Sequence, residues 1–287
     1  MPSLRDIRRR IRGVKSTAQI TRAMQMVAAS RMRRAQLRAQ DSRPYARAIA
    51  TMVGELSQQR GDPSSLHPLQ RRRPEHHAAY VVFTSDRGLA GALNANVLRR
   101  AATDILARSE TPDVVTVGRK GQDFFTRRGH ALLATFIGLT DKGQYDDVLP
   151  VARVLTNAYS EERVDAVYLV YPEFVSTLMQ RPTVTRLLPL GEIGEHGTAT
   201  DFIIEPDPEE ILNALLPRYV EVQIYRALLE TAASFFSAQM VAMRTATENA
   251  ENLVKDLTLA YNKARQGAIT KEISEISSAA EAMAQAR

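Results

Sequence analysis

The sequence contains no cysteine and no tryptophan, and aromatic residues make up only 6% of its 287 positions. The absence of cysteine excludes a disulfide framework, a thiolate metal site and a cysteine nucleophile. Few aromatic residues beside many Ala, Met and Arg residues favour long helices over a compact all-β fold. No apolar run approaches the roughly 18 residues of a transmembrane helix, and the N-terminus lacks the apolar segment of a secretory signal.

Candidate catalytic and metal-binding groups are also missing. The five histidines lack the spacing of metal ligands, since only His76 and His77 are adjacent, so we expect no metal ion and no cofactor. Paired carboxylates such as Asp146 and Asp147 stand apart from other candidate catalytic groups. Acid–base catalysis needs several positioned groups in one pocket. We therefore expect that the chain is not itself an enzyme.

Positive charge is concentrated at the N-terminus. Residues 1–50 hold thirteen Arg or Lys and two Asp, while the whole chain has a net charge of +6. This asymmetry predicts an acidic partner for the first segment: nucleic acid, a membrane surface or a protein. No aromatic residue that could stack on bases lies between Arg5 and Arg38. A basic coiled coil that faces acidic protein loops is thus at least as well supported as one that binds nucleic acid.

Both ends of the chain predict long helices. Ser3 and Asp6 form a capping pair at the first helix, and we expect Pro44 to bend that helix without ending it. Asp207 and Pro208 suit the cap and first position of the last helix. Apolar residues of the first helix recur in steps of three and four, shift once, and then continue: Leu4, Ile7, Ile11, Val14 and Ala18, then Met24, Val27, Ala28, Met32 and Ala35.

The last helix is unusually long. After Pro217 there is no further proline and only one glycine, Gly267, over seventy residues. A helix of that length spans about 105 Å. The apolar stripes of the two terminal helices predict that they pair as an antiparallel coiled coil. The C-terminal helix then extends beyond its partner, and a lone helix with an apolar stripe needs another protein around it.

The middle of the chain alternates strands and helices, which predicts a parallel or mixed sheet covered by helices. The turn Ser85–Asn94 follows a predicted strand and precedes a predicted helix, a position at which a glycine-containing turn can bind phosphate. It matches neither of the two common glycine-rich nucleotide-binding motifs. A tight structural turn is therefore the better explanation. We expect strands at 79–83, 114–117, 132–137, 166–171 and 184–190, and helices at 93–107, up to Arg128, and 148–160.

The predicted fold is therefore mixed α+β, with an α/β (Rossmann-like) domain inserted between two helices of a long antiparallel coiled coil. The expected segments are an N-terminal coiled-coil helix at 1–58, a polar linker at 59–77, the α/β domain at 78–205 and a C-terminal coiled-coil helix at 206–287. A small-molecule enzyme that uses the α/β domain is a further alternative.

Two segments resemble the signatures of a known family. Ile20–Met32 is similar to the N-terminal helix motif of ATP synthase gamma subunits, and Ile269–Glu275 to their C-terminal motif. The resemblance covers essentially the whole chain, because further matches follow in order: Ser85–Asn94, Glu205–Pro208, Arg218–Glu221 and Met240–Asn249.

The resemblance implies the central rotor of a proton- or sodium-translocating F-type ATP synthase. Such a rotor couples rotation of a ring of c subunits to conformational change in the catalytic beta subunits. The implied partners are three alpha and three beta subunits, an epsilon subunit and the c ring, with no nucleic acid. The implied location is peripheral, on the cytoplasmic face of the bacterial plasma membrane.

The resemblance also implies contact residues. Gln239 stands where the family often has Arg, and Ala90 and Ala92 replace a Cys and a Gly of the family's turn. The chain lacks the cysteine-containing insert of chloroplast gamma subunits, so thiol control is not expected. Contacts to the c ring are expected at Phe202, Ile203 and Glu205. Contacts to the catalytic head are expected at Met24, Arg22, Arg31, Arg33, Arg34, Gln239, Arg265, Gln266, Thr270, Glu272 and Glu275.

Overall fold

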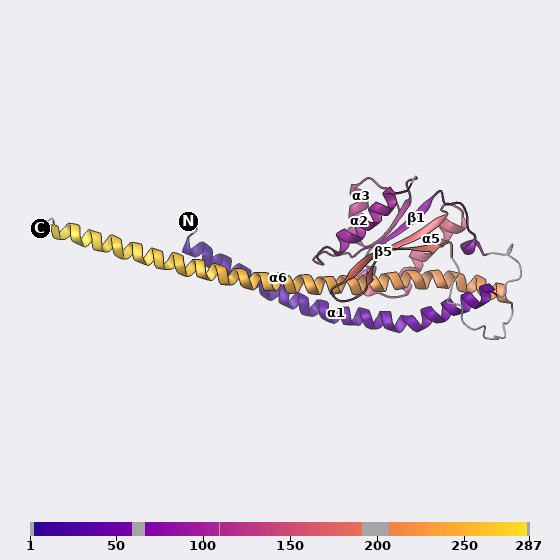
Figure 1. The fold of residues 1–287 in the computed structure, drawn as a ribbon, viewed down its shortest axis with the longest axis horizontal. Helices are drawn as coiled ribbons and strands as arrows, with labels where there is room; N and C mark the ends of the chain where they lie inside the picture. Colours follow the sequence, from indigo (N-terminus) through magenta and orange to yellow (C-terminus); the bar gives the residue numbers. More distant parts are fainter. Residues whose placement is uncertain (1–2, 59–66, 109, 191–206, 286–287) are drawn as a thin grey trace. The chain divides into compact units, whose positions relative to one another are not determined.

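The computed structural model describes residues 3–58, 67–108, 110–190 and 207–285. It divides into two compact units. The sheet unit comprises residues 28–239, and the helical unit comprises residues 1–27 together with 240–287. Helix α1 (Leu4–Gln58) and helix α6 (Pro208–Gln285) each contribute to both units (Figure 1). The predicted long helices at the two ends are thus confirmed.

A five-stranded mixed sheet organises the sheet unit. The strand order is β3-β2-β1-β4-β5, and only β5 runs antiparallel to its neighbour. This confirms the expected parallel or mixed sheet. The last strand begins earlier than expected because β4 and β5 form a hairpin that pairs Phe174 with Gln180. The strands are β1 (Ala78–Phe83), β2 (Asp113–Val117), β3 (Leu132–Phe136), β4 (Ala166–Phe174) and β5 (Gln180–Leu188).

Helices cover both faces of the sheet. Along β1, Tyr80 and Val82 pack toward one face with α2 and α3, while Val81 and Phe83 pack toward the other face with α5, α1 and α6. This alternation follows from the two-residue period of a strand, and every β1 side chain is buried. The helices are α2 (Leu93–Leu106), α3 (Arg119–Arg127), α4 (Leu139–Lys142) and α5 (Leu149–Ser160), with 3₁₀ turns at Pro68–Gln70 and Asp146–Val148.

Both helix caps predicted from the sequence are present. The Asp6 N–H donates to Ser3 Oγ at 3.2 Å, and the Glu209 N–H donates to Asp207 Oδ2 at 3.2 Å. Helix α1 continues through Pro44 as expected, and α6 continues through Pro217. A proline ring removes one helical hydrogen bond, so the neighbouring packing must hold both helices together at these points.

Part of the segment expected to be a solvated linker is packed instead. Leu69 is 1% exposed, and its carbonyl accepts a 2.9 Å hydrogen bond from the Leu190 N–H. Arg73 donates from Nη2 to the carbonyl oxygens of Tyr159 and Val164, at 2.8 and 3.0 Å. Residues 67–77 thus form hydrogen bonds to the segment after β5 and to the connection between α5 and β4. The four-segment division of the chain remains a proposal.

Candidate functional site

The helical unit is an antiparallel pair formed by the start of α1 and the later part of α6. Arg8 contacts Tyr261, with its guanidinium carbon 5.4 Å from the ring centre. Further along α1, Thr21 contacts Thr247, and Arg22 forms an ion pair with Glu251. The partner numbers on α6 fall from 261 to the range 247–251 as those on α1 rise, so the two segments run in opposite directions (Figure 1).

A continuous heptad spacing defines the contact face of this pair, without the shift expected from the sequence. Thr21 and Gln25 continue the steps of three and four after Ala18, and Thr21 is buried. Val27 was predicted to lie in the stripe, but it is 53% exposed, because the heptad position falls on Ala28. On α6 the matching buried or half-buried positions are Met243, Thr247, Ala250, Val254, Leu257, Tyr261 and Ala264.

The predicted contact residues near the N-terminus differ in their surroundings. In the helical unit, Met24 is half-buried, and the exposed Arg22 is paired with Glu251. In the sheet unit, Arg31 lies over the ring of Phe236, with 5.7 Å from guanidinium carbon to ring centre. Arg33 and Arg34 are exposed. Among the described residues, one of these four arginines is thus paired with an acidic side chain and another lies over an aromatic ring.

The predicted contact residues on α6 are mostly solvent-facing. Gln239, in the sheet unit, is half-buried. In the helical unit, the Thr270 hydroxyl donates back to the Gln266 carbonyl at 3.0 Å, and Glu275 lies 3.6 Å from Lys271. Arg265, Gln266, Thr270, Glu272 and Glu275 are all exposed. The predicted c-ring contacts Phe202, Ile203 and Glu205 lie outside the described residues.

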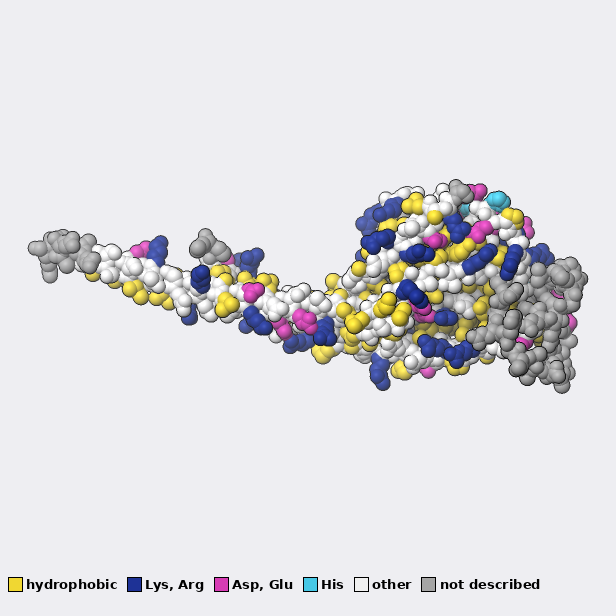
Figure 2. Space-filling view, viewed as in Figure 1, with side chains coloured by type: hydrophobic (Ala, Val, Ile, Leu, Met, Phe, Trp, Pro, Cys, Tyr) yellow, Lys and Arg dark blue, Asp and Glu magenta, His cyan; other side chains and the backbone are white. Residues whose placement is uncertain are grey.

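Beyond the paired segment, α6 carries an apolar stripe on its surface. Every side chain from Arg265 to Ala280 is exposed. Among them Ile269, Ile273 and Ile276 are 48%, 61% and 64% exposed and follow the helical spacing of four and three. Figure 2 shows hydrophobic side chains along this part of the helix. A single helix with such a stripe gains stability only when a partner covers it.

The turn after β1 is held by its own polar groups. Asp86 accepts hydrogen bonds from the Arg119 and Gly138 N–H groups, both at 3.0 Å. Asn94 Oδ1 accepts from the Ser85 N–H at 3.1 Å, and the Ser85 hydroxyl lies 2.6 Å from the Arg87 carbonyl. These contacts support the interpretation of a tight structural turn.

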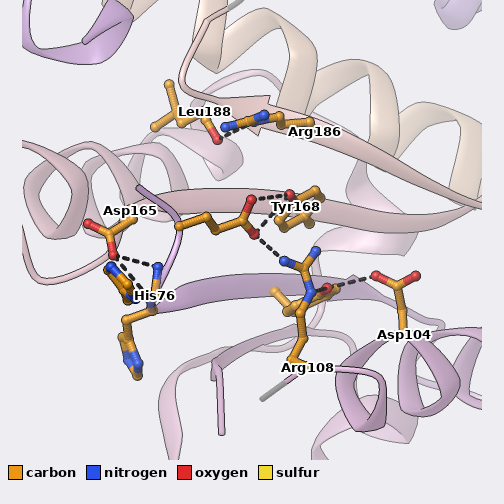
Figure 3. Close-up of polar contacts among 10 residues, drawn as sticks. His76, Asp104, Arg108, Asp165, Tyr168, Arg186 and Leu188 are labelled. Carbon is orange, nitrogen blue, oxygen red and sulfur yellow. Dashed lines mark hydrogen bonds and ion pairs between the residues drawn. The ribbon is translucent and has the colours of Figure 1, made fainter. Parts of the chain in front are cut away.

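A second polar cluster joins β1, β4 and α2 in the sheet unit (Figure 3). Tyr80 Oη donates to Asp104 at 2.7 Å, and Arg108 Nε donates to Tyr80 Oη at 2.9 Å. Burial, reinforced by Asp104, raises the pKa of Tyr80. Arg108 also lies 4.6 Å over the Tyr168 ring and forms an ion pair with Glu75. The charges of the cluster are thus engaged with one another.

The described ranges contain neither a metal-binding cluster nor a membrane-spanning helix. In these ranges no group of three or more His, Asp or Glu side chains could hold a metal ion. None of the helices traced there is both long enough and apolar enough to cross a membrane.

A protein-family model described as ATP synthase matches residues 3–283. The ATP synthase gamma chain of Roseiflexus castenholzii is 49% identical over 294 residues, covering 99% of this chain and 100% of that protein. That of Chloroflexus aurantiacus is 50% identical over 289 residues, covering 99% of each. The chain belongs to the ATP synthase gamma family. It is therefore a gamma subunit of an ATP synthase, which is a non-catalytic subunit of that complex.

Solved structures with a similar fold include chains of ATP synthases. The central stalk and c-ring structure of Tetrahymena thermophila matches with a TM-score of 0.62 and 23% identity, covering 79% of this chain and 99% of that chain. The rotor of Euglena gracilis matches with a TM-score of 0.67 and 20% identity, covering 93% and 98%. At these identities the likeness establishes a shared fold.

Sequence reasoning missed the partners of several predicted residues. Glu251, Tyr261 and Phe236 were not identified, although each lies opposite an arginine of α1. Thr21 was missed because a hydroxyl residue interrupts an apolar stripe. The signal that could have found it is the unbroken spacing from Ala18 through Thr21 and Gln25 to Ala28.

Proposed function

We propose that this gamma-family chain is a rotor that couples rotation of a c ring to conformational change in the catalytic beta subunits. The observation that carries the proposal is the exposed stripe of Ile269, Ile273 and Ile276 on a helix that continues past its α1 partner. A shaft enclosed by a ring of subunits would have that stripe covered. The polar and small side chains between the isoleucines would limit interlocking with the enclosing subunits.

The coupling follows from asymmetry. One helix pair cannot present identical faces to three beta subunits, so each subunit meets different side chains at a given rotor angle. If one face binds an open subunit more tightly and another face binds a closed one, rotation shifts each site in turn. The linkage is reciprocal, so nucleotide binding also favours particular rotor angles. The same chain thus serves synthesis and hydrolysis.

The residues proposed for contact with the catalytic head fall in three groups. Met24 is half-buried and lies in the basic N-terminal segment, so a change of charge there alters a surface where charge matters. The arginines would face acidic loops of beta subunits. The α6 residues would line the enclosed part of the shaft. In full, the contacts are Met24, the arginines Arg22, Arg31, Arg33 and Arg34, and on α6 Gln239, Arg265, Gln266, Thr270, Glu272 and Glu275.

A second contact, to the c ring, is proposed through Phe202, Ile203 and Glu205. An epsilon subunit would lie beside it. A cysteine at each of the three positions should form crosslinks to subunit c. Absence of crosslinks at all three, with positive controls elsewhere in the complex, would contradict this assignment. In a bacterial cell the rotor would lie at the cytoplasmic face of the plasma membrane and would be driven by protons or sodium ions.

A photocrosslinking experiment tests directly whether the unpaired part of α6 is enclosed by the catalytic head. A photoreactive residue replaces Gln266, which is exposed on the unpaired part of α6. In the purified complex it should crosslink to alpha or beta subunits. The control is the same group at Arg153, an exposed residue of α5, which should not yield those products. Crosslinks from Arg153 but not from Gln266 to the catalytic head would contradict the proposed placement.

A further inference from the structure

The sheet unit contains a groove between α1 and α6 that the rotor assignment does not explain. Its volume is about 1020 Å³. Residues 36–50 of α1 form one wall, residues 219–233 of α6 form the other, and Tyr145 and Phe174 also line it. Fifteen residues of helix extend about 22 Å, so the groove follows some four turns of each helix.

The sequence itself leaves this space open. The heptad spacing of α1 continues from Ala35 through Ala39, Ser42 and Ala46 to Ile49. The three middle positions carry small side chains, and all three line the groove. Packed helices normally fill the seam between them to high density. Filling resumes at the next heptad positions of α1, where the large side chains are buried: Ile49, Val53 and Leu56.

The walls of the groove carry an excess of positive charge. Arg43 and Arg47 are exposed on the α1 wall, one helical turn apart, and form no ion pair with any residue that the structure describes. Like charges at this spacing repel each other. Arg226 on the α6 wall is 3.0 Å from Glu230. Asp41 and Glu230 are the acidic residues that line the groove, against Arg38, Arg43, Arg47 and Arg226.

The groove also has an amphipathic lining. Tyr45, Tyr219 and Tyr225 line the walls. Tyrosine offers an apolar ring and a polar hydroxyl, which suits a protein partner. An occupant with acidic groups and apolar side chains would complement these features.

The length of the groove favours a polypeptide. Its volume of about 1020 Å³ is at the upper end of the roughly 300–1,000 Å³ of small-molecule sites, but its walls run along some four helical turns, which suits an extended partner. We propose that the groove is the docking site for an acidic amphipathic helix of a neighbouring subunit. Its apolar side chains would pack on Ala39 and Ala46, and its carboxylates would face Arg43 and Arg47. This proposal rests on the proposed function in one respect: it assumes that the neighbouring subunit belongs to the assembled ATP synthase.

The test places a photoreactive residue at Ser42 in the purified complex, with Arg153 as the control position. The expected product joins Ser42 to a segment of another subunit that is helical and rich in Asp or Glu. Crosslinks only within the chain, to lipid, or to a segment without excess acid would overturn the proposal. So would recovery of the same segment from Arg153.

Charge reversal separates docking from chance proximity. The double substitution Arg43→Glu and Arg47→Glu should lower the Ser42 crosslink yield about tenfold. The matched control Arg99→Glu with Arg153→Glu reverses two exposed arginines outside the groove and should leave the yield unchanged. Ala46→Trp, which fills the groove without a change of charge, should also lower it. Equal yields in all variants would overturn the proposal. Intact Gln266 crosslinks in the same samples would show that the rotor assignment stands independently.

Discussion

Thr21 and Thr247 face each other across the helix pair, with their hydroxyl oxygens 2.7 Å apart. Both side chains are buried, at 9% and 5% exposure. They occupy heptad positions that apolar residues would otherwise fill, so they form one polar layer in the seam. A polar pair of this kind is satisfied in only one alignment of the helices. It therefore specifies the register in which α1 meets α6.

The first prediction concerns the free energy that couples these two threonines. Thr21→Val and Thr247→Val should each lower the free energy of unfolding by about 0.5–1.5 kcal/mol, because one hydrogen bond is lost. The double variant should lower the free energy of unfolding by less than the sum of the two single variants, because both polar partners are then removed together. Unfolding in urea measures the double-mutant cycle.

Thr17 and Thr258 provide the matched control for that cycle. Their hydroxyls lie 3.1 and 2.7 Å from carbonyl oxygens of their own helices, and those of Thr21 and Thr247 lie similarly close to such carbonyls, but the side chains of Thr17 and Thr258 are exposed. Their Val substitutions should be additive. Additivity in the Thr21–Thr247 cycle as well would show that the polar layer contributes no specific energy.

The second prediction concerns Gly118, which lies between β2 and α3. Its φ is +106°, and a Cβ atom there would lie 2.1 Å from the Thr84 carbonyl oxygen. Gly118→Ala should destabilise the fold by about 3 kcal/mol or more, since a clash with backbone adds to the strain of a positive φ. Gly129→Ala should cost only about 1–2 kcal/mol, because φ is +74° but the space around it is open. Thermal unfolding measures both variants, and equal losses of stability in Gly118→Ala and Gly129→Ala would contradict the predicted clash.

The third prediction concerns the pH dependence of the β4–β5 hairpin. Hydrogen bonds from Arg181 lower the pKa of Glu173 and outweigh the opposing effect of burial. A carboxyl whose pKa is lower in the folded state stabilises the fold fully above its unfolded pKa, about 4.3. That contribution is lost as the pH falls through the folded pKa. The stability gap between the parent and Glu173→Gln should therefore be larger at pH 7 than at pH 3.

Urea unfolding at the two pH values measures this gap. Glu161→Gln is the control, since Glu161 pairs with Arg163 on the surface, 3.0 Å apart, where an ion pair contributes little. A gap for Glu173→Gln that stays constant between pH 7 and pH 3 would exclude the proposed ion-pair contribution.

The fourth prediction concerns energy coupling at Met24. Met24→Lys adds a charge at a half-buried position of the basic N-terminal segment. A new ion pair with a stator subunit could contribute on the order of 1 kcal/mol, and a favoured rotor angle would hinder further rotation. ATP-driven proton pumping should fall more than ATP hydrolysis does. Met24→Gln, similar in length but uncharged, should retain coupling. Equal loss of pumping and hydrolysis would indicate misassembly instead.

Much of the fold could be predicted because local signals agree with packing. The apolar run Ala78–Phe83 is buried on both faces of the sheet, and Ser3 and Asp207 cap their helices. Strand β5 was placed too late because its first half, Gln180–Thr183, lacks an apolar pattern and pairs only through the hairpin. Leu69 was assigned to a solvated loop because its contacts come from distant segments.

The site was harder to predict, because the residues proposed for it would act on partners and not on this chain. Arg265 and Glu272 are exposed, so no internal packing identifies them. Their assignment depends on the resemblance of the terminal motif to the gamma family. The groove at Ser42, by contrast, could not be recognised from spacing alone, since small residues in a seam can also bring helices closer together.

The most direct test of the central claim is a single-molecule rotation measurement. A complex of alpha, beta and this chain is fixed through its beta subunits, and a bead is attached through a cysteine at Arg99, which is exposed on α2. With ATP present, the account predicts continuous rotation in one direction with three dwell positions per turn. Hydrolysis at full rate with a stationary bead, in complexes shown to contain this chain, would contradict its role as a rotor.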